Sequence, residues 1–380
     1  MVELFLAILF WGGSALLVYT FLGYPVLVHS LGKSSPLVRT SKTDTPPSPP
    51  SVSVVLIVRN EGSRIDARLQ NLLDTHHPID SLEIIVVSDG SDDDTVERAK
   101  FAGDHVNLIE KETRRGKPAC LNDGVSVATG ELIVFADARQ KFTPETIPAL
   151  VRAFTDPEVG AVSGELIIVE SETGIATGVD AYWKLEKAVR LGESRLDSSI
   201  GCTGAIYAIR RELFRRLPDD TLLDDVVCPM QIALQDKRVL FEPEAVAYDP
   251  QHLEPSLEQR RKRRTLAGNF QMLFRYPSWL VPWKNRLILQ LISHKYLRLL
   301  APVLLVHTLV VAVILAALGS PFFLLASLAQ GTFYLLAVVG MLLPGTSRKC
   351  FSLPAGFVFL NIMTVLGFFD YLRGRHQQGW

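Results

Sequence analysis

The sequence predicts an α/β domain with a mostly parallel β-sheet flanked by helices, joined to about four transmembrane helices. Three observations predict this class. Between residue 52 and about residue 255, short apolar strands alternate with helix-like stretches, which is the order of a parallel sheet with helices on its faces. Successive strands there end in polar residues, as strands do at the ligand-binding edge of such a sheet. The two ends of the chain are strongly apolar.

The strands of the α/β domain end in carboxylates. Strands are expected at 52–58, 84–87 and 132–136, and helices at 64–73, 95–102 and 118–128. Glu61 follows the first strand, Asp89 the second and Asp137 the third. Because ligands bind at the carboxyl ends of such strands, Asp89 and Asp137 are expected to hold one ligand between them. Asp94 is expected to cap the helix that begins at Thr95.

Four segments are long and apolar enough to cross a bilayer, which takes about 20 residues. They are 4–31, 299–318, 322–343 and 353–372. The first lacks the basic start and the cleavage site of a signal peptide and should remain as an anchor. We therefore divide the chain into a membrane helix (1–31), a Pro/Ser linker (32–51), the α/β domain (52–255), amphipathic interface helices (256–298), three membrane helices (299–372) and a tail (373–380).

Basic residues lie on both sides of the α/β domain. Lys33 and Arg39 follow the first span, and the dense basic run 260–264 precedes the second. Because basic residues favour the cytoplasmic side of a membrane, the domain is expected in the cytosol. Four crossings would then leave Arg373 and Arg375 outside. Either this tail is an exception, or one of the last three segments does not fully cross.

Composition excludes several classes of function. The chain has 39 Lys and Arg against 40 Asp and Glu, so its net charge of −1 gives no sign of nucleic-acid binding. Its four cysteines show no Cys-x-x-Cys spacing, and neither zinc nor disulfides are expected. These cysteines are Cys120, Cys202, Cys228 and Cys350.

Several motifs follow one another along the chain. They are 54–61, Ser88-Asp89-Gly90-Ser91 with Asp94-Thr95, the run 115–122, the run 130–137, Asp224-Asp225, and 261–268. In this order they resemble the motifs of family 2 glycosyltransferases. The resemblance is closest to the membrane-bound branch that contains poly-N-acetylglucosamine, hyaluronan and cellulose synthases, and it extends to the flanking membrane helices. It implies a GT-A-like fold.

The resemblance assigns a nucleotide-sugar donor to the strand ends. Asp89 resembles the aspartate that accepts a hydrogen bond from the uracil ring, although it could instead form an Asx-turn. Arg115 and Lys117 lie on either side of Gly116 before a helix, which is typical of a loop that faces phosphates, although a solvated loop is equally compatible. Glu61, in the first motif, is also assigned to the donor.

The resemblance further implies a divalent metal, Mg²⁺ or Mn²⁺, held by Asp137. Asp137 matches the first aspartate of the family's Asp-x-Asp motif, but Arg139 stands where the second should be. Mg²⁺ commonly takes one or two carboxylates plus phosphate oxygens and water, so one aspartate could suffice. Alternatively, Arg139 could itself neutralise the diphosphate.

Asp225 matches the family's general base, which an inverting displacement requires near the acceptor hydroxyl. Asp224 is the alternative, with the two roles reversed. The acceptor sugar is assigned to Cys202, Thr203 and Gly204. Trp183 is expected to line the same groove, although a tryptophan at helical spacing could instead belong to the core. Small residues at 201–205 would let a sugar ring approach the backbone.

The last motif is the least faithful to the family. Polymerising members carry Gln-x-x-Arg-Trp, in which the arginine meets the diphosphate. Arg264 matches this arginine, whereas Thr265 replaces the tryptophan and Arg261 the glutamine. Arg264 is therefore a donor-binding candidate, and repeated transfer is in question. The alternative for these charges is binding to anionic lipid.

Together these features predict an integral membrane glycosyltransferase of the bacterial inner membrane, with its catalytic domain in the cytosol. It would move a sugar from a nucleotide-sugar donor, expected to be a UDP-sugar, to a glycan or lipid-linked acceptor with inversion, in polysaccharide or glycolipid synthesis. Its other expected partners are membrane lipid and polysaccharide export proteins, and not nucleic acid. The alternatives are a non-processive polyprenyl-phosphate or lipid glycosyltransferase, and a catalytically weak scaffold subunit of an export complex.

Overall fold

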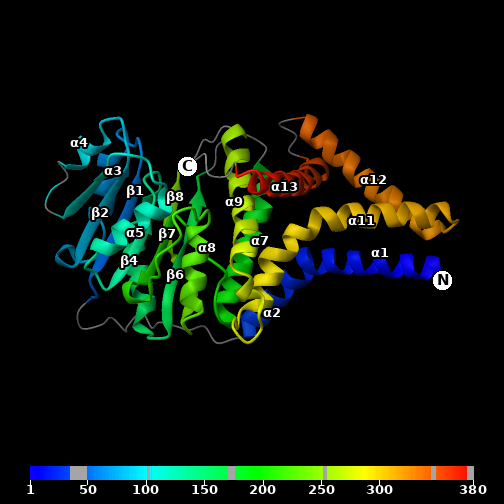
Figure 1. Cartoon of the computed structure of the whole chain (residues 1–380), viewed down its shortest axis with the longest axis horizontal. Helices are drawn as coiled ribbons and strands as arrows, with labels where there is room; N and C mark the ends of the chain where they lie inside the picture. Colours follow the sequence, from blue (N-terminus) through cyan, green and yellow to red (C-terminus); the bar gives the residue numbers. More distant parts are fainter. Residues whose placement is uncertain are drawn as a thin grey trace.

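The computed structural model describes residues 1–34, 49–100, 103, 105–169, 176–250, 255–343 and 348–374, without the side chains of 79, 176–184 and 255–258. A β-sheet covered by helices lies at one end of the molecule, and long apolar helices lie at the other (Figure 1). Helices α7 (Ala176–Leu196), α8 (Asp224–Ala233) and α9 (Pro255–Arg275) stand between them. The predicted combination of an α/β domain and apolar helices is confirmed.

The described residues form one sheet of eight strands in the order β3-β2-β1-β4-β7-β6-β8-β5. The strands are β1 (Val52–Val58), β2 (Leu82–Asp89), β3 (Val106–Lys111), β4 (Leu132–Ala136), β5 (Lys141–Phe142), β6 (Val159–Ile168), β7 (Ile206–Arg210) and β8 (Arg238–Asp249). Strands β1 to β4 are parallel, whereas β7 runs antiparallel to its neighbours β4 and β6. The sheet is mostly parallel, as predicted, and the carboxyl ends of β1, β2 and β4 meet at one edge.

Alternate residues of β1 fill two separate cores. Val54, Leu56 and Val58 belong to the core of one face, and Val55 and Ile57 to that of the other. The first face is covered by α3 (Ile65–Leu73), α4 (Thr95–Lys100) and α6 (Thr146–Arg152), and the second by α5 (Lys117–Val127) and α8. A strand buried on both faces is apolar throughout, which explains the continuous apolar runs in the sequence.

The loops that follow β1 and β2 are tied together by one aspartate. Asp93 Oδ1 accepts a hydrogen bond from the backbone N–H of Thr95 (3.0 Å), and its Oδ2 accepts one from the N–H of Gly62 (3.0 Å). Asp94 instead pairs with Arg98 (2.6 Å). Asp94 precedes α4 as predicted, with its carbonyl oxygen accepting the N–H of Arg98 (3.1 Å), but the side chain that bonds both the helix start and the neighbouring loop is that of Asp93.

Four helices of the described residues are long and apolar enough to cross a membrane. The first comprises α1 (Val2–Val18), a π-helical turn η1 (Tyr19–Gly23) and α2 (Tyr24–Ser34). The others are α11 (Leu297–Ala317) with the turns before it, α12 (Pro321–Leu342) and α13 (Lys349–Leu372). Large apolar side chains such as Leu325 and Leu335 point outward from these helices. Apolar surface of this extent is typical of contact with lipid.

The segment between the sheet and the membrane helices contains α9, the turn η5 (Pro277–Leu280), α10 (Ile288–Leu291) and the π-helical turn η6 (Ile292–Tyr296). Helix α9 packs along α13. Arg263 of α9 binds both carboxylate oxygens of Asp370 of α13, at 2.8 and 2.6 Å. The rings of Phe270 and Phe368 lie 5.0 Å apart. Part of the basic run thus binds protein and is not available to lipid headgroups.

The contact with α9 places the end of α13 beside the sheet domain. The turn between α11 and α12 lies at the opposite end of the helices, near the N terminus (Figure 1). Arg373, which directly follows α13, is therefore on the same side of the bundle as the sheet. This arrangement favours the second alternative raised by the sequence, in which one of the last three apolar segments does not fully cross. Residues 375–380, with Arg375, lie outside the described residues.

We expect two inserted reporters to lie on the same side of the membrane. One would be placed in the linker, at residues 35–48, and the other after residue 380. Because α13 ends against α9, both should be labelled from the side that holds the sheet domain. Accessibility of single cysteines introduced at these places, in spheroplasts of a strain that expresses the protein, measures this. Opposite labelling would mean that α13 crosses the membrane.

A second prediction concerns Gly192, where α7 and α2 cross. A Cβ atom at Gly192 would lie 2.6 Å from Val28 Cγ1 and 2.8 Å from the Val28 carbonyl oxygen. Overpacking costs about 1–3 kcal/mol, more than the up to about 1 kcal/mol that alanine gains over glycine in a helix. Gly192→Ala should therefore lower the Tm of the detergent-solubilised protein. Gly12→Ala is the control, because nothing lies within 4 Å of its added Cβ, and its Tm should not fall.

Candidate active site

Polar residues converge where β1, β2 and β4 end. Residues 52–58 of β1 pair in register with 82–88 of β2, and 52–56 pair with 132–136 of β4. Glu61 therefore follows β1, Asp89 ends β2, and Asp137 follows β4 at the same edge of the sheet. The sequence predicted this convergence from the strand ends alone. It provides carboxylates at the place where α/β sheets bind ligands.

Asp89 is fully buried and fastens the loop before α5. Its Oδ1 accepts a hydrogen bond from the backbone N–H of Arg115 (2.6 Å) and its Oδ2 one from Gly116 (3.0 Å). The thiol of Cys120 donates to Oδ1 at 3.3 Å. Gly116 has a φ of 91°, which favours glycine at this point. These contacts hold Lys117 at the first turn of α5; direct contact of Asp89 with a nucleobase stays a prediction.

Two other residues that are predicted to bind the nucleotide-sugar donor, Glu61 and Arg115, lie at the edge of the site. Glu61 is half-buried, and its carboxylate pairs with Arg64 at 2.8 Å. The guanidinium of Arg115 points toward Asp123, at 2.7 Å, and lies 3.9 Å from Asp219. Both charged groups are engaged with neighbours on the protein surface, so their roles toward a donor stay predictions.

A lysine lies between two carboxylates at the centre of the site. Lys117 Nζ is 2.8 Å from Asp137 Oδ1 and 4.0 Å from Asp224 Oδ2. Burial alone would lower the pKa of Lys117, but the two carboxylates raise it above its ordinary value. Burial would raise the pKa of Asp137, but Lys117 outweighs it and holds that pKa below its ordinary value, helped by the charges of Arg139 and Arg261. The centre is thus ionised, with Asp137 and Lys117 facing each other.

Arg139 is bound to a buried carboxylate at the end of β8. Its Nε and Nη2 donate to the two carboxylate oxygens of Asp249, at 2.8 and 2.7 Å. Gln140 Nε2 donates to the same group at 3.0 Å, and Asp249 is only 1% exposed. A bidentate pair of this kind neutralises the guanidinium and fixes its direction. The geometry favours a positioning role for Arg139 over the alternative in which it neutralises the diphosphate.

Asp224 and Asp225 begin α8, where the helix N terminus favours negative charge. Asp224 is buried, and its Oδ2 has no hydrogen-bond partner among the described residues. Asp225 is partly exposed. Burial and the neighbouring carboxylate of Asp224 raise the pKa of Asp225 to about 6, against the opposing charges of Lys117 and Arg190. A carboxylate whose pKa lies close to neutrality is well suited to accept a proton.

The loop predicted to bind the acceptor packs directly on Asp225. A Cβ atom at Gly204 would lie 3.1 Å from Asp225 Oδ2, so only glycine leaves this space beside the carboxylate. The backbone N–H of Cys202 donates to the Asp225 carbonyl oxygen at 2.7 Å, while the Cys202 side chain is buried. Thr203 N–H donates to Ser163 Oγ at 2.9 Å. The structure therefore brings this loop and the candidate base together.

Arg190 of α7 was not singled out from the sequence. Its Nη1 donates to Thr203 Oγ1 at 3.0 Å, which places a cation behind the loop that is predicted to bind the acceptor. The only signal for it was the helical spacing of Glu186, Arg190 and Glu193. The predicted acceptor residue Trp183 lies outside the described side chains.

Helix α9 brings further arginines to the site. The charge of Arg261 acts on Asp137, and the charge of Arg264 acts on Arg261. Thr265 Oγ1 donates to the Arg261 carbonyl oxygen one turn earlier (3.0 Å), so it occupies the tryptophan position without an aromatic ring. The sequence predicted Arg264 as a donor contact, whereas Arg261 was noted there only as the replacement of the family's glutamine.

The residues present fit a divalent ion only in part. No group of three His, Cys, Asp or Glu residues suited to a metal occurs within the described part of the chain. Asp137 and the orphaned Asp224 Oδ2 nevertheless lie on either side of Lys117 Nζ. A metal held by Asp137 would need phosphate and water oxygens to complete its coordination, which is common for Mg²⁺.

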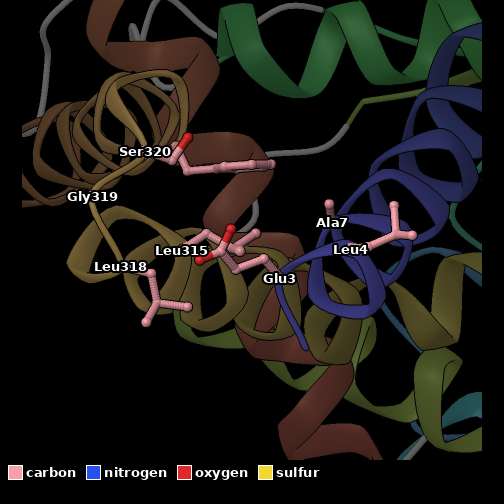
Figure 2. A pocket seen from close by; sticks show the side chains of 8 residues that line it. Glu3, Leu4, Ala7, Leu315, Leu318, Gly319 and Ser320 are labelled. Carbon is pink, nitrogen blue, oxygen red and sulfur yellow. The ribbon is translucent and has the colours of Figure 1, made fainter. Parts of the chain in front are cut away.

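A separate hollow lies far from these groups. It encloses about 350 Å³ between α1 and the turn from α11 to α12, and Figure 2 shows Glu3, Leu4, Leu315 and Ser320 among its lining residues. This turn is at the end of the helices opposite the sheet (Figure 1). The hollow is therefore no part of the candidate active site.

The chain is similar to several known glycosyltransferases. Residues 53–217 match the family described as glycosyl transferase family 2. The chain is 23% identical over 258 residues to a probable glycosyltransferase, YdaM, of Bacillus subtilis, covering 63% of this chain and 60% of that protein. It is 23% identical over 205 residues to a poly-beta-1,6-N-acetyl-D-glucosamine synthase of Staphylococcus epidermidis, covering 52% and 49%. The chain thus spans about half to three-fifths of these relatives.

A solved structure is similar over nearly the whole chain. The mannosyltransferase PcManGT from Pyrobaculum calidifontis, in complex with GDP-Man and Mn²⁺, has a TM-score of 0.65 at 25% identity, and the match covers 94% of this chain and 99% of that one. The predicted GT-A-like fold is confirmed by this likeness. The match of residues 53–217 to this family and the shared fold agree with the motifs that converge at the sheet edge, and this part of the chain is similar to the family 2 glycosyl transferases.

Proposed function

We propose that this chain is a membrane-bound, inverting glycosyltransferase that moves a sugar from a nucleotide-sugar donor to a hydroxyl of a glycan or lipid-linked acceptor. The observation that carries the proposal is Asp225. Its carboxylate, with a pKa of about 6, lies against Gly204 of the acceptor loop and beside the ionised centre of Lys117 and Asp137. A base and a cationic site for a leaving diphosphate are the two parts that such a displacement needs.

In the proposed reaction, the hydroxyl oxygen of the acceptor attacks C1 of the donor sugar, and Asp225 accepts the proton of that hydroxyl. The new C1–O bond forms on the face opposite the bond to the diphosphate, which breaks with its electron pair on the diphosphate oxygen. Lys117 and Arg264 stabilise the charge that develops on this leaving group. Asp224 keeps a second negative charge beside Asp225 and thereby raises its proton affinity.

The donor is proposed to lie over the carboxyl ends of β1, β2 and β4, between Glu61 and Arg115, with Asp89 holding the loop that carries Lys117. A UDP-sugar remains our proposal for the donor. PcManGT was solved with GDP-Man, so GDP-mannose belongs in the same donor screen as UDP-N-acetylglucosamine and UDP-glucose. Release of the nucleotide from detergent-solubilised protein measures donor use. No release with any donor would favour the scaffold alternative.

We also propose that a divalent ion, Mg²⁺ or Mn²⁺, binds at Asp137 together with the donor. Support comes from the Mn²⁺ in the structure of PcManGT and from the carboxylates on either side of Lys117. When bound, it would add positive charge next to the diphosphate. Asp137 is our proposed protein ligand, and because its Oδ1 already accepts a hydrogen bond from Lys117, the ion would bind at its other oxygen.

The proposed setting is the bacterial inner membrane, with the sheet domain in the cytosol, where it would contribute to polysaccharide or glycolipid synthesis, with polysaccharide export proteins as further partners. A second candidate, transfer of a single sugar, is favoured by Thr265. This residue replaces the tryptophan that polymerising relatives place at the acceptor end, and its hydroxyl is bonded to its own helix. Product length in the transfer reaction, one added sugar or many, separates the two.

Asp225→Asn should abolish turnover and leave donor binding nearly intact. The amide keeps the shape of the side chain and loses the proton acceptor, and general-base catalysis contributes about 10²- to 10⁴-fold. Turnover by nucleotide release and donor affinity by calorimetry measure the two effects.

The matched control is Asp224→Asn, which removes the neighbouring charge but leaves Asp225 in place. In the wild type, kcat/KM should fall as the pH drops through about 6, because Asp225 is then protonated. In Asp224→Asn this fall should occur at a lower pH, because the charge that raises the pKa of Asp225 is gone. If Asp224→Asn abolished turnover and Asp225→Asn did not, Asp224 would be the base and Asp225 its charged neighbour.

The second test concerns the metal. If an ion at Asp137 neutralises the diphosphate, EDTA and Asp137→Ala should each stop turnover. Arg139→Ala should be mild in activity, because Asp249 already holds its guanidinium, but should lower the Tm by leaving a buried carboxylate unpaired. Arg152→Ala is the control, since it removes an exposed pair with Glu244. Full activity in EDTA together with an inactive Arg139→Ala would make Arg139 the partner of the diphosphate.

A further inference from the structure

Arg190 of α7 is a largely buried arginine to which the proposed reaction gives no role. Its side chain is 15% exposed, and its Nη1 donates to Thr203 Oγ1 at 3.0 Å. Its Nε lies 3.4 Å from Glu186 Oε1, one turn earlier on the same helix. Because an arginine stays charged throughout the pH range of folded proteins, a permanent positive charge lies behind the predicted acceptor loop.

The carboxylate of Glu186 helps to hold Arg190 in place. Arg298 Nη1 donates to Glu186 Oε2 at 2.8 Å, and His294 Nε2 lies 2.9 Å from Oε1. Lys295 Nζ lies 3.6 Å from Oε1. Glu186 is buried, and these three partners come from η6 and the start of α11. Arg190 is therefore held by a side chain that is itself bonded to the apolar helices.

Thr203 joins Arg190 to the predicted acceptor loop. The Thr203 hydroxyl accepts the hydrogen bond from Arg190 and donates one to the carbonyl oxygen of Gly164 in β6, at 3.1 Å. The neighbouring residue, Cys202, donates its N–H to the carbonyl oxygen of Asp225 at 2.7 Å. The loop thus lies between Arg190 and Asp225 and is bonded to both. Loss of the arginine would release one side of a loop that packs on the proposed base.

Arg190 is also among the cations whose charges act on Asp225. Lys117 of α5 and Lys295 of η6 act in the same sense, and all three favour the ionised carboxylate. Burial and the charge of Asp224 favour the protonated form. The cations therefore limit the rise of the pKa of Asp225 to about 6.

Two further titratable groups lie close to this carboxylate, the thiol of Cys202 and the hydroxyl of Tyr207. Burial raises the pKa of both well above their ordinary values, and Asp225 adds to this rise. Both groups therefore stay neutral between pH 5 and 8. A shift of the pH dependence in a variant of Arg190 would then report the changed charge beside Asp225.

We propose that Arg190 is a positioning residue of the glycosyl transfer. It holds the predicted acceptor loop through Thr203, and its positive charge keeps Asp225 ionised and ready to accept the proton of the acceptor hydroxyl. Arg190 acts through these two groups and need not touch a substrate. This inference rests on the proposed function and adds to it a residue that acts through the base.

The pH dependence of kcat/KM for the donor, measured by nucleotide release from the detergent-solubilised full chain, tests the charge. Arg190→Gln removes the charge, so the fall in kcat/KM at low pH should move to higher pH by roughly half to one unit. At pH 6 this shift should cause a deficit of about two- to fivefold, which should vanish toward pH 8. Arg190→Lys keeps the charge and should restore the wild-type position of the fall.

Thr203→Val tests the hydrogen bond separately. It keeps nearly the same side-chain shape and the charge of Arg190, but it removes the hydroxyl that Arg190 and Gly164 share. kcat/KM should fall by about tenfold at every pH, while the fall at low pH should stay at its wild-type position. Thr203→Ser retains the hydroxyl and should recover most of the activity. Arg190→Gln should show both effects together.

Arg286→Gln is the control for a loss of stability alone. Arg286 is 33% exposed, its Nε donates to Asp197 at 3.0 Å, and its Nη1 donates to the carbonyl oxygen of Ala233, the last residue of α8. Asp225 lies near the other end of α8, eight residues or about 12 Å away. Arg286→Gln should lower the Tm and leave the pH dependence of kcat/KM unchanged.

The outcomes separate this inference from the proposed function. A loss of kcat/KM by the same factor at pH 6 and pH 8 in Arg190→Gln would make Arg190 a structural residue only and overturn the inference. A shift in Arg190→Lys as large as that in Arg190→Gln would do the same, because charge would not be its cause. A higher donor KM without a shift would assign Arg190 to the donor instead. If no donor releases its nucleotide, or if Asp225→Asn keeps full turnover, the proposed function itself fails.

Discussion

The candidate active site depends on three carboxylates gathered around one ammonium group, that of Lys117. Lys117 lies 2.8 Å from Asp137 and 4.0 Å from Asp224, so one positive charge serves both. Asp225 has the like charge of Asp224 beside it and no ion pair within the described part of the chain, and its pKa rises to about 6. Like charges in a partly desolvated site separate the proton affinities of chemically identical groups. One aspartate can then remain ionised near a diphosphate while another accepts a proton.

Several loop contacts around this centre hold Lys117 in position. Asp89 uses both carboxylate oxygens on the backbone before α5, and Gly116 takes a positive φ so that the helix can begin at Lys117. Asp93 joins the loops after β1 and β2. A motif that resembles a ligand-binding sequence can therefore act partly through loop geometry, because Asp89 is fully buried and bonds two backbone N–H groups of the loop.

The sequence predicted the sheet edge and the order of its carboxylates because strand ends are local features. It could not predict the partner of Arg139, since Asp249 lies at the end of β8, far along the chain. The same holds for Arg190, Lys295 and His294, whose contacts join α7 to η6 across about a hundred residues. Helical spacing marked the α7 face but could not reveal what packs on it.

The membrane helices show how one ion pair can decide an ambiguity that hydropathy leaves open. Asp370 is a carboxylate within an apolar segment, and such a residue needs a partner or a functional reason. Its partner is Arg263 of α9, which ties the end of α13 to the helix that adjoins the active site. Through α9, and through the buried ion pairs of α7 with η6 and α11, the sheet domain is joined to the apolar helices at two places.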